Sequence, residues 1–472
     1  MDGKERQPWH TFIFVVGVLG SFGLLSVVNP RAEWSISESL VLRLPTWRPW
    51  EDFSLEKEAE AMALEDSARE WAIQDSLAAQ GETPRKKPKP GQGFIQFSPE
   101  DSMGFSKLVV ALEKVRQGGS ARIIHFGDSQ IEGDRITGDL RDALQRAYGG
   151  EGPGMQPLVP FVPMAAVASS AEGSWTRMVS FGRKNDKSPS NKYGPRGISH
   201  RYQSREGTGP DAVVRFSPRS YGYARARQSK QFTLLHGPAQ GPLEVKWFAN
   251  DTLWKIEYLD SAARGGALKA VATTPVKSLR LEFKGASPDF YGLAMDGTQG
   301  LAVDNVAMRG ADGLSFSRMD RPHFIQSLQR QPVALVILQF GGNAVPYFKS
   351  KEAVERYGEA FRRQIRLFQE ALPAADILVI GPSDMAVKEG MDWVSYPFVD
   401  DVRDALRRAA FAEGAGFFDV MDYMGGPGSM AEWVNTNPPL AGADHIHFTP
   451  KGAKKEATAL VEAMNDELAR HD

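Results

Sequence analysis

The sequence predicts an α/β fold in which helices cover both faces of a parallel sheet, and a second, strand-rich region interrupts that fold. Short apolar segments alternate with long helical patterns on both sides of the interruption. Within the interruption, long helical patterns give way to short alternating stretches separated by turn residues. A chain of 472 residues is long enough for two or three folded units, at about 150 residues per unit.

Composition and charge exclude several classes of protein. Hydrophobic residues at 42% and charged residues at 24% are close to the averages of globular chains, which excludes global disorder. The 56 Lys plus Arg and 58 Asp plus Glu give a net charge of −2, so we expect no nucleic-acid partner. The absence of cysteine excludes disulfides, thiolate zinc sites and a cysteine nucleophile, and it is consistent with an oxidising compartment.

The N-terminus carries an uncharged segment at residues 11–28, which would form a helix of roughly 27 Å, nearly the thickness of a bilayer core. The segment runs into Asn29-Pro30 without the small-residue cleavage pattern of a secretory signal peptide. We therefore expect residues 1–30 to be an uncleaved signal anchor. The chain would be a single-pass protein of the inner (cytoplasmic) membrane, with its catalytic domain in the periplasm or outside the cell. A buried core helix is the less favoured alternative, because the segment is terminal and apolar on every face.

A spacer is predicted between the anchor and the folded region, over residues 31–95. Residues 51–80 have a loosely helical, highly charged pattern, and residues 85–91 are rich in Lys and Pro, which favours a stiff, extended linker. The bases of this linker could contact an anionic polymer or lipid, but a solvated spacer is the plainer interpretation.

The α/β domain is predicted in two parts, residues 96–155 and 300–472. Its strands are expected at residues 123–126, 333–340, 377–380 and 417–420, and its helices at 105–115, 134–147, 352–372, 399–412 and 451–468. Residues 156–299 are predicted to be an inserted antiparallel β-sandwich, with strands at 212–216, 231–235, 243–248, 253–258 and 279–283.

The strongest local motif is Phe126-Gly127-Asp128-Ser129-Gln130, at the end of a predicted strand and before a helix. In open α/β sheets, sites form at that edge. A serine there can present its hydroxyl to a ligand, while its backbone N–H faces a developing anion. A turn followed by a helix cap is the alternative for this motif taken alone.

A second motif, Asp444-His445-Ile446-His447, precedes the last predicted helix. A serine becomes a good nucleophile when a histidine accepts its proton and a carboxylate fixes the tautomer of that histidine. A spacing of three lets Asp444 and His447 point to one side of a loop or first helical turn. A metal site built from Asp444, His445 and His447 is a less favoured alternative, because the other histidines are scattered along the chain.

Two further segments could supply hydrogen-bond donors to an oxyanion. Gly341-Gly342-Asn343 comes after the most apolar strand, and the Asn343 amide could donate a hydrogen bond to an oxyanion. A turn asparagine is an equal alternative. Gly310, in the segment Met308-Arg309-Gly310-Ala311, could supply a backbone N–H, although alone it is a loop glycine.

Taken together in chain order, the segments of Ser129, Gly310, Asn343 and His447 resemble the SGNH (GDSL-type) hydrolase superfamily. Its members carry Ser, Gly, Asn and His blocks in that order, and the last block has the form Asp-x-x-His. The resemblance implies a three-layer α/β/α parallel-sheet hydrolase domain with serine esterase activity and no metal or organic cofactor. It implies Ser129 as nucleophile, His447 as base and Asp444 as the group that orients His447. The Ser129 N–H, the Gly310 N–H and the Asn343 side chain would form the oxyanion hole. The GDSL-type hydrolases are named after the sequence Gly-Asp-Ser-Leu, and this chain has Gln130 in place of the Leu.

Within the superfamily, Phe417-Phe418-Asp419-Val420 and the Gly-rich segment 424–440 look like the bacterial peptidoglycan O-acetylesterases. Those enzymes carry a carbohydrate-binding-like β-sandwich between the Ser and Gly blocks. The resemblance therefore implies a membrane-anchored extracytoplasmic esterase that removes O-acetyl groups from peptidoglycan or another O-acetylated polysaccharide.

Three aromatic residues of the predicted sandwich could have either of two roles. Trp247, Trp254 and Tyr258 could stack on sugar rings, although aromatics in alternating strands more often belong to a core.

Two other functions are alternatives to the esterase. A polysaccharide O-acetyltransferase would use the same serine and pass the acyl group to a sugar. A non-catalytic, membrane-tethered glycan-binding scaffold would keep the fold without the reaction.

Overall fold

The structure is a computed structural model that describes residues 33–37, 40–43, 94–98 and 103–470. The predicted signal anchor lies outside these residues, as do the charged helical segment and the Lys/Pro-rich linker. No helix within the described ranges is long and apolar enough to span a membrane. The chain divides into two units, 1–63 and 64–472. In the first unit, β1 (Glu33–Ser37) and β2 (Leu40–Arg43) pair antiparallel.

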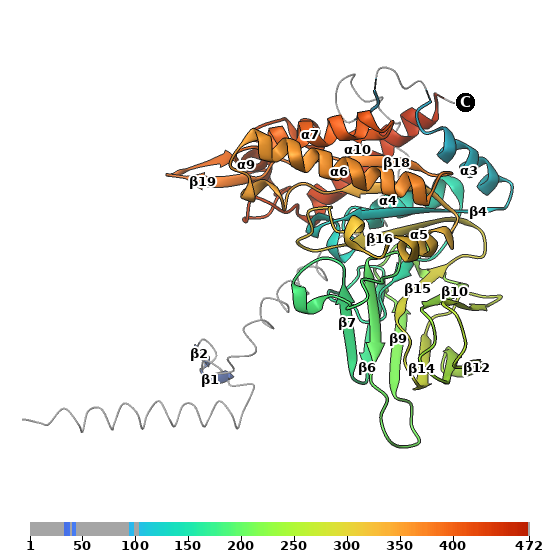
Figure 1. Ribbon diagram of the computed structural model, residues 1–472. Helices are drawn as coiled ribbons and strands as arrows, with labels where there is room; N and C mark the ends of the chain where they lie inside the picture. Colours follow the sequence, from blue (N-terminus) through green and yellow to red (C-terminus); the bar gives the residue numbers. More distant parts are fainter. Residues whose placement is uncertain (1–32, 38–39, 44–93, 99–102, 471–472) are drawn as a thin grey trace, which may run out of the picture. The chain divides into compact units, whose positions relative to one another are not determined.

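The second unit contains a six-stranded sheet with the strand order β16-β4-β17-β18-β21-β3 (Figure 1). Its pairs are parallel, except that β3 runs antiparallel to β21. The strands are β3 (Ile95–Gln96), β4 (Ser120–Gly127), β16 (Gly300–Ala307), β17 (Val333–Gln339), β18 (Asp376–Ile380) and β21 (Gly416–Phe418).

Helices pack on both faces of this sheet, because successive side chains of its strands point to opposite sides. In β17, Val336 and Leu338 belong to the core beneath one group of helices: α5 (Arg321–Gln329), α6 (Lys351–Ala371) and α7 (Val399–Ala412). Leu335 and Ile337 belong to the core beneath the other group: α3 (Ser106–Arg116), α4 (Thr137–Tyr148) and α10 (Pro450–Leu468). The predicted three-layer α/β/α architecture is confirmed.

Several predicted elements differ from the observed ones by a few residues at their ends, and two of these differences have a clear local cause. The strand expected at 417–420 ends at Phe418, because the Asp419 side chain accepts the backbone N–H of Asp422 and begins α8 (Val420–Met424). The helix expected from residue 134 starts at Thr137, because a 3₁₀ turn, η1 (Ser129–Asp134), comes first.

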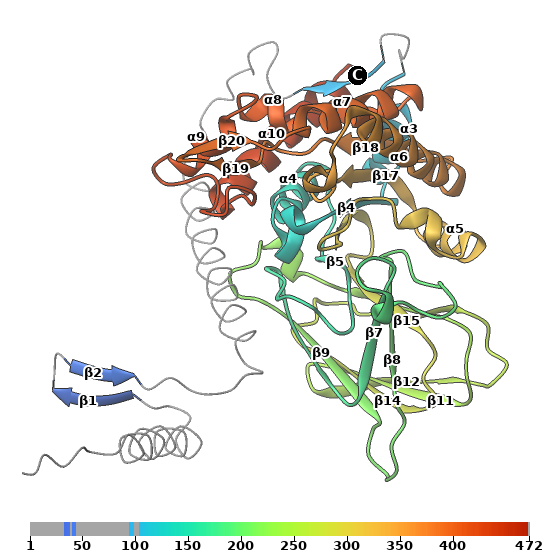
Figure 2. The same ribbon diagram turned by 60° about the vertical axis from the view of Figure 1, so that its left-hand side comes forward.

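Residues 154–296 form two antiparallel sheets that pack face to face (Figure 2). The first has the strand order β13-β10-β15-β8-β7, with β5 also paired to β15. Its strands are β5 (Gly154–Gln156), β7 (Trp175–Val179), β8 (Ile198–Tyr202), β10 (Gln231–His236), β13 (Gly266–Val271) and β15 (Phe290–Asp296). The second has the order β12-β11-β14-β9-β6. Its strands are β6 (Val167–Glu172), β9 (Ala212–Pro218), β11 (Leu243–Ala249), β12 (Thr252–Leu259) and β14 (Leu279–Gly285).

The three aromatic residues considered for sugar stacking have different environments. Trp247 is fully buried in the core between the two sheets, so its ring cannot meet a ligand. Trp254 packs against the same core. Tyr258 is 70% exposed, and its hydroxyl donates a hydrogen bond to Glu244. Of these three rings, that of Tyr258 is the most accessible.

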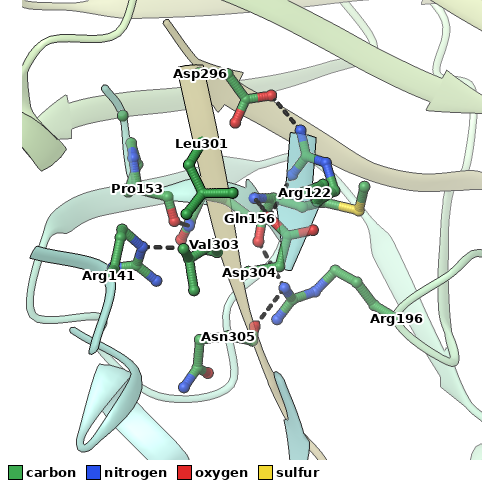
Figure 3. A network of polar contacts seen from close by, with 12 residues as sticks. Arg122, Arg141, Pro153, Gln156, Arg196, Asp296, Leu301, Val303, Asp304 and Asn305 are labelled. Atoms are coloured by element: carbon green, nitrogen blue, oxygen red, sulfur yellow. Dashed lines mark hydrogen bonds and ion pairs between the residues drawn. The ribbon is translucent and has the colours of Figure 1, made fainter. Parts of the chain in front are cut away.

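Buried ion pairs join the insertion to the parallel sheet. Arg122 of β4 lies between Asp304 of the edge strand β16 and Asp296 at the end of β15, and it pairs with both (Figure 3). All three residues are buried. On the same strand β16, the carbonyl oxygen of Asn305 accepts a hydrogen bond of 2.6 Å from Arg196. These contacts attach the sandwich to the edge of the sheet. Separating the two would leave buried charges without partners, which has a high free-energy cost.

Candidate active site

The predicted site segments follow three adjacent parallel strands at their carboxyl ends. Ser129 follows β4, the middle strand, while Gly310 follows β16 and Asn343 follows β17, the strands on either side of it. Parallel alignment brings the loops after these strands to one edge of the sheet, where open α/β folds bind their ligands.

The turn after β4 depends on Gly127. A Cβ at this position would lie 2.9 Å from Ile131 Cδ1 and 3.2 Å from the carbonyl oxygen of Gln339, so a larger residue would require the Ile131 side chain and this carbonyl to shift. The next residue, Asp128, accepts the backbone N–H of Gln130 at 2.9 Å and caps the turn η1. Ser129 is therefore the first residue of a capped helical turn.

Ser129, His447 and Asp444 form a continuous hydrogen-bonded chain. The Oγ of Ser129 lies 2.7 Å from Nε2 of His447, and Nδ1 of His447 lies 2.7 Å from Oδ2 of Asp444. If Nδ1 carries the proton and donates to the carboxylate, Nε2 presents its lone pair to the serine hydroxyl. This is the arrangement that activates a serine.

The second oxygen of Asp444 fixes the loop that carries His447. Oδ1 accepts the backbone N–H groups of Ile446 and His447, each at 3.0 Å. Partial burial works to raise the pKa of Asp444, but the hydrogen bonds from His447 and Ile446 outweigh it and hold the pKa below its ordinary value. Asp444 is therefore ionised at neutral pH.

Asn343 lies in the same cavity as Ser129, with its amide oriented by two acceptors. Its Nδ2 donates to Oδ2 of Asp128 at 2.9 Å and to the carbonyl oxygen of Ala311 at 3.3 Å. The turn that places it begins at Gly341, whose φ of +123° favours glycine. Burial raises the pKa of Asp128, and the hydrogen bonds from Gln130 and Asn343 offset this only in part.

Gly310 occupies a different position from the other predicted site residues. It has a φ of +75° and lines a neighbouring cavity, which shares Asn343 with the cavity of Ser129. The residues before it are held firmly, since Met308 is buried in the core and Arg309 pairs with Glu132 at 3.1 Å. The structure thus brings Ser129, Asn343 and His447 to one cavity and places Gly310 in the adjoining one.

The cavity that contains Ser129 has a volume of about 190 Å³. The loops after β4, β17 and β18 and the segment before α10 contribute to its wall. Its lining residues are Asp128, Ser129, Gln130, Gln339, Phe340, Gly342, Asn343, Pro346, Tyr347, Gly381, Pro382, Ser383, Met385, Ile446 and His447.

Gln130 is a positioning residue that sequence reasoning missed. Its Nε2 donates to the carbonyl oxygen of Ile446 at 2.7 Å, and its Oε1 accepts the N–H of Phe448 at 3.3 Å. The side chain therefore joins the serine turn to the chain on both sides of His447. The local sequence marks this position only as a departure from the Leu of the name-giving motif.

A chain of buried polar side chains links β4 and β17 to the helices α4 and α10. Gln339 donates to Glu456 of α10 at 2.7 Å, and its Oε1 lies 2.9 Å from Nε2 of His125. The other nitrogen of His125 lies 3.0 Å from the Thr137 hydroxyl. Burial lowers the pKa of His125 to about 4 and raises that of Glu456 to about 8, so both are neutral at pH 7. This chain ties the strands before Ser129 and Asn343 to the helix after His447.

The alternative metal site at Asp444, His445 and His447 does not form. The ring of His445 stacks on Trp393, with centroids 3.7 Å apart and planes 12° apart, while His447 faces Ser129. Across the part of the chain that the structure describes, no group of three His, Asp or Glu side chains could hold a metal ion.

The comparisons with known proteins agree with this geometry. Residues 283–455 match the GDSL-like Lipase/Acylhydrolase family. The part of the chain over residues 283–455 belongs to this family of SGNH, or GDSL-type, hydrolases. The match includes the Gly310, Asn343 and His447 segments of this SGNH hydrolase and begins after Ser129. The predicted resemblance to this superfamily is confirmed, and the chain is an esterase of that class.

Solved structures are similar to this SGNH hydrolase over much of its length. A structure described as "Peptidoglycan O-acetylesterase in action, 5 min" matches with a TM-score of 0.63 and 23% identity, over 80% of this chain and 99% of that one. A salicylyl-acyltransferase, SsfX3, from a tetracycline biosynthetic pathway matches with a TM-score of 0.28 and 13% identity, over 67% and 97% of the two chains. A family two carbohydrate esterase from Clostridium thermocellum, in complex with cellohexaose, matches with a TM-score of 0.26 and 10% identity, over 63% of this chain and 99% of that one. No curated protein matches the sequence.

Proposed function

We propose that the chain is a serine esterase that removes O-acetyl groups from a cell-wall or surface glycan. The observation that carries this proposal is the chain of two 2.7 Å contacts from Ser129 through His447 to Asp444. The O-acetyl glycan substrate is supported by the similarity of the fold, at a TM-score of 0.63, to a peptidoglycan O-acetylesterase.

The reaction follows from the positions of these three side chains. Ser129 Oγ attacks the acetyl carbonyl carbon while Nε2 of His447 accepts the serine proton, and Asp444 stabilises the resulting imidazolium. When the tetrahedral intermediate breaks its bond to the sugar oxygen, His447 returns the proton to that oxygen. Water then attacks the acyl carbonyl carbon while His447 accepts a proton from it. The second tetrahedral intermediate breaks its bond to Ser129 Oγ, which takes that proton back from His447 as acetate leaves.

We expect three donors to stabilise the oxyanion: the N–H of Ser129, the Asn343 amide, and the N–H of Gly310 from the adjoining cavity that shares Asn343. Of the two hydrogen bonds that Asn343 makes, the one to Ala311 is the longer, at 3.3 Å. That hydrogen is the one we expect to turn toward the oxyanion, while the bond to Asp128 keeps the amide in place. One such donor typically contributes about 100- to 1,000-fold in rate.

The proposed setting of this enzyme is the outer side of the inner membrane. The uncharged segment at residues 11–28 and the absence of cysteine support an exported, membrane-anchored protein. The inserted sandwich would hold the polymer near the site, and the exposed ring of Tyr258 could stack on sugar.

The test is acetate release by the purified full-length chain from a short chromogenic acetate ester and from O-acetylated peptidoglycan. We expect wild type to release acetate from both and Ser129→Ala to lower the rate by about 1,000-fold or more. The exposed sandwich serine variant Ser220→Ala is the control. Release that requires an acceptor sugar would instead favour an O-acetyltransferase, and no turnover of any acyl ester would favour a non-catalytic scaffold.

A further inference from the structure

The cavity of Ser129 adjoins a second and larger cavity of about 610 Å³. The two share Asn343 and Tyr347 in their walls, and Tyr347 is 81% exposed between them. A substrate bound at Ser129 and longer than its acetyl group can therefore extend past Tyr347 into the second cavity.

The second cavity is lined by more bases than acids. Lys187, Arg318 and Arg356 line it together with a single acid, Asp312. The bases come from three separate segments: the end of the turn η2 (Lys184–Asp186), the turn η4 (Phe316–Arg318) and the helix α6. Convergence of cations from separate segments on one concave surface concentrates positive potential there.

These bases are not committed to structural ion pairs. Within the described part of the chain, the side chains of Lys187 and Arg318 have no hydrogen-bond or ion-pair partner. Arg356 interacts electrostatically with Glu352, one turn earlier on α6. The acid of the cavity is already engaged, since Oδ1 of Asp312 accepts the N–H of Leu314 at 2.9 Å.

Guanidinium and ammonium groups that line one concave surface form a receptor suited to an oxyanion.

We propose that this second cavity binds an oxyanion, a carboxylate or a phosphate, that is carried by the same glycan whose ester Ser129 cleaves. The inference rests on the proposed function and narrows its substrate to anionic glycans. The shared wall at Asn343 and Tyr347 is the reason to place the anion on the substrate rather than on a separate ligand. A neutral glycan would leave the three bases without a complementary group.

The test measures kcat/KM on three acetylated oligosaccharides that are matched in length: one neutral, one with a carboxylate and one with a phosphate. The wild-type chain should prefer an anionic substrate, and the preference should weaken as salt is raised, because the bases are exposed to solvent. In Arg318→Gln and in Arg356→Gln, the ratio of anionic to neutral kcat/KM should fall about 10-fold, the loss expected for a hydrogen bond between charged groups.

The matched control is Arg363→Gln, an exposed arginine of the same helix α6 that lines neither cavity. Its ratio should equal that of wild type. Turnover of the neutral substrate shows in each variant that the Ser129 site is intact, so a failure of the esterase proposal is separate from a failure of this one. An equal kcat/KM on all three substrates, or an anionic preference that survives both substitutions, would overturn the anion site. The anionic oligosaccharide with the higher kcat/KM, the one with the carboxylate or the one with the phosphate, identifies the anion that the cavity binds.

Discussion

The side-chain amide of Asn343 donates a 2.9 Å hydrogen bond to the carboxylate of Asp128, the residue directly before Ser129. The contact joins the loop after β17 to the turn after β4 and determines which end of the amide faces the cavity. Because a carboxylate accepts hydrogen bonds, the nitrogen of Asn343 must point toward Asp128 and its oxygen away. The hydrogen bonds of the amide therefore define its orientation for donation to an oxyanion.

Asn343→Ala should lower kcat on a short acetate ester by about 100- to 1,000-fold, because it removes one donor from the developing oxyanion. The KM should change much less, since a donor that acts in the transition state contributes little to ground-state binding. Steady-state kinetics test this, with Asn435→Ala as an asparagine control remote from the cavity. A kcat within threefold of wild type would remove Asn343 from the oxyanion hole.

Asp444→Asn should lower kcat by roughly 100- to 10,000-fold, because an amide can no longer stabilise the imidazolium of His447. Hydrogen bonds from His447 and Ile446 hold the pKa of Asp444 below its ordinary value. The carboxylate therefore stays ionised as pH falls from 8 to 5, and any loss of wild-type activity over that range arises from another group. The measurement is kcat/KM against pH for both proteins, with the exposed Asp466→Asn as control. Wild-type activity that followed protonation of Asp444 in this range would contradict the assignment.

The parts of the fold that sequence predicts well have local signals. The continuous apolar run at 333–340 is almost the whole of β17 (Val333–Gln339), because a strand buried on both faces needs apolar residues at every position. Ser129 and His447 are identifiable because each follows a recognisable pattern at the end of a strand or before a helix. Asp444 is identifiable from its spacing of three from His447.

Other parts have no local signal. Gln130 contacts the backbone of Ile446, 316 residues away, and no pattern of neighbouring residues predicts that contact. The short helix α5 is not predicted, because a nine-residue helix with a Pro in its first turn shows little periodicity. The hairpin of β19 (Ala386–Glu389) and β20 (Asp392–Ser395) is not predicted either, because its four-residue strands are too short to show a clear alternation.

Arg122→Ala should lower the free energy of unfolding by about 3–5 kcal/mol, because it leaves the Asp296 and Asp304 carboxylates buried without their cation. Urea unfolding measures this loss. The matched control is Arg201→Ala, which removes a partly exposed arginine paired with Asp289 at 2.9 Å and should cost about 0–1 kcal/mol. If the free energy of unfolding fell by the same small amount in both variants, the ion pairs of Arg122 would not stabilise the junction of the sandwich and the sheet.

Glu456 gives the stability a pH dependence whose sign follows from its environment. Burial raises its pKa to about 8 in the folded chain, while an unfolded chain would have a value near 4.5. Between these values the folded chain binds more protons than the unfolded chain, so the stability contributed by this group falls as pH rises. Below pH 4.5 the contribution is fully present, and above pH 8 it is lost.

Glu456→Gln should therefore reduce the fall in the free energy of unfolding between pH 5 and pH 8. The amide oxygen of the variant can still accept the hydrogen bond from Gln339, and the side chain no longer ionises. Urea unfolding at the two pH values tests this, with Glu462→Gln as a control on the same helix. We expect the control to follow wild type. A Glu456→Gln variant that loses the same stability as wild type between pH 5 and pH 8 would show that Glu456 is not protonated in the folded chain.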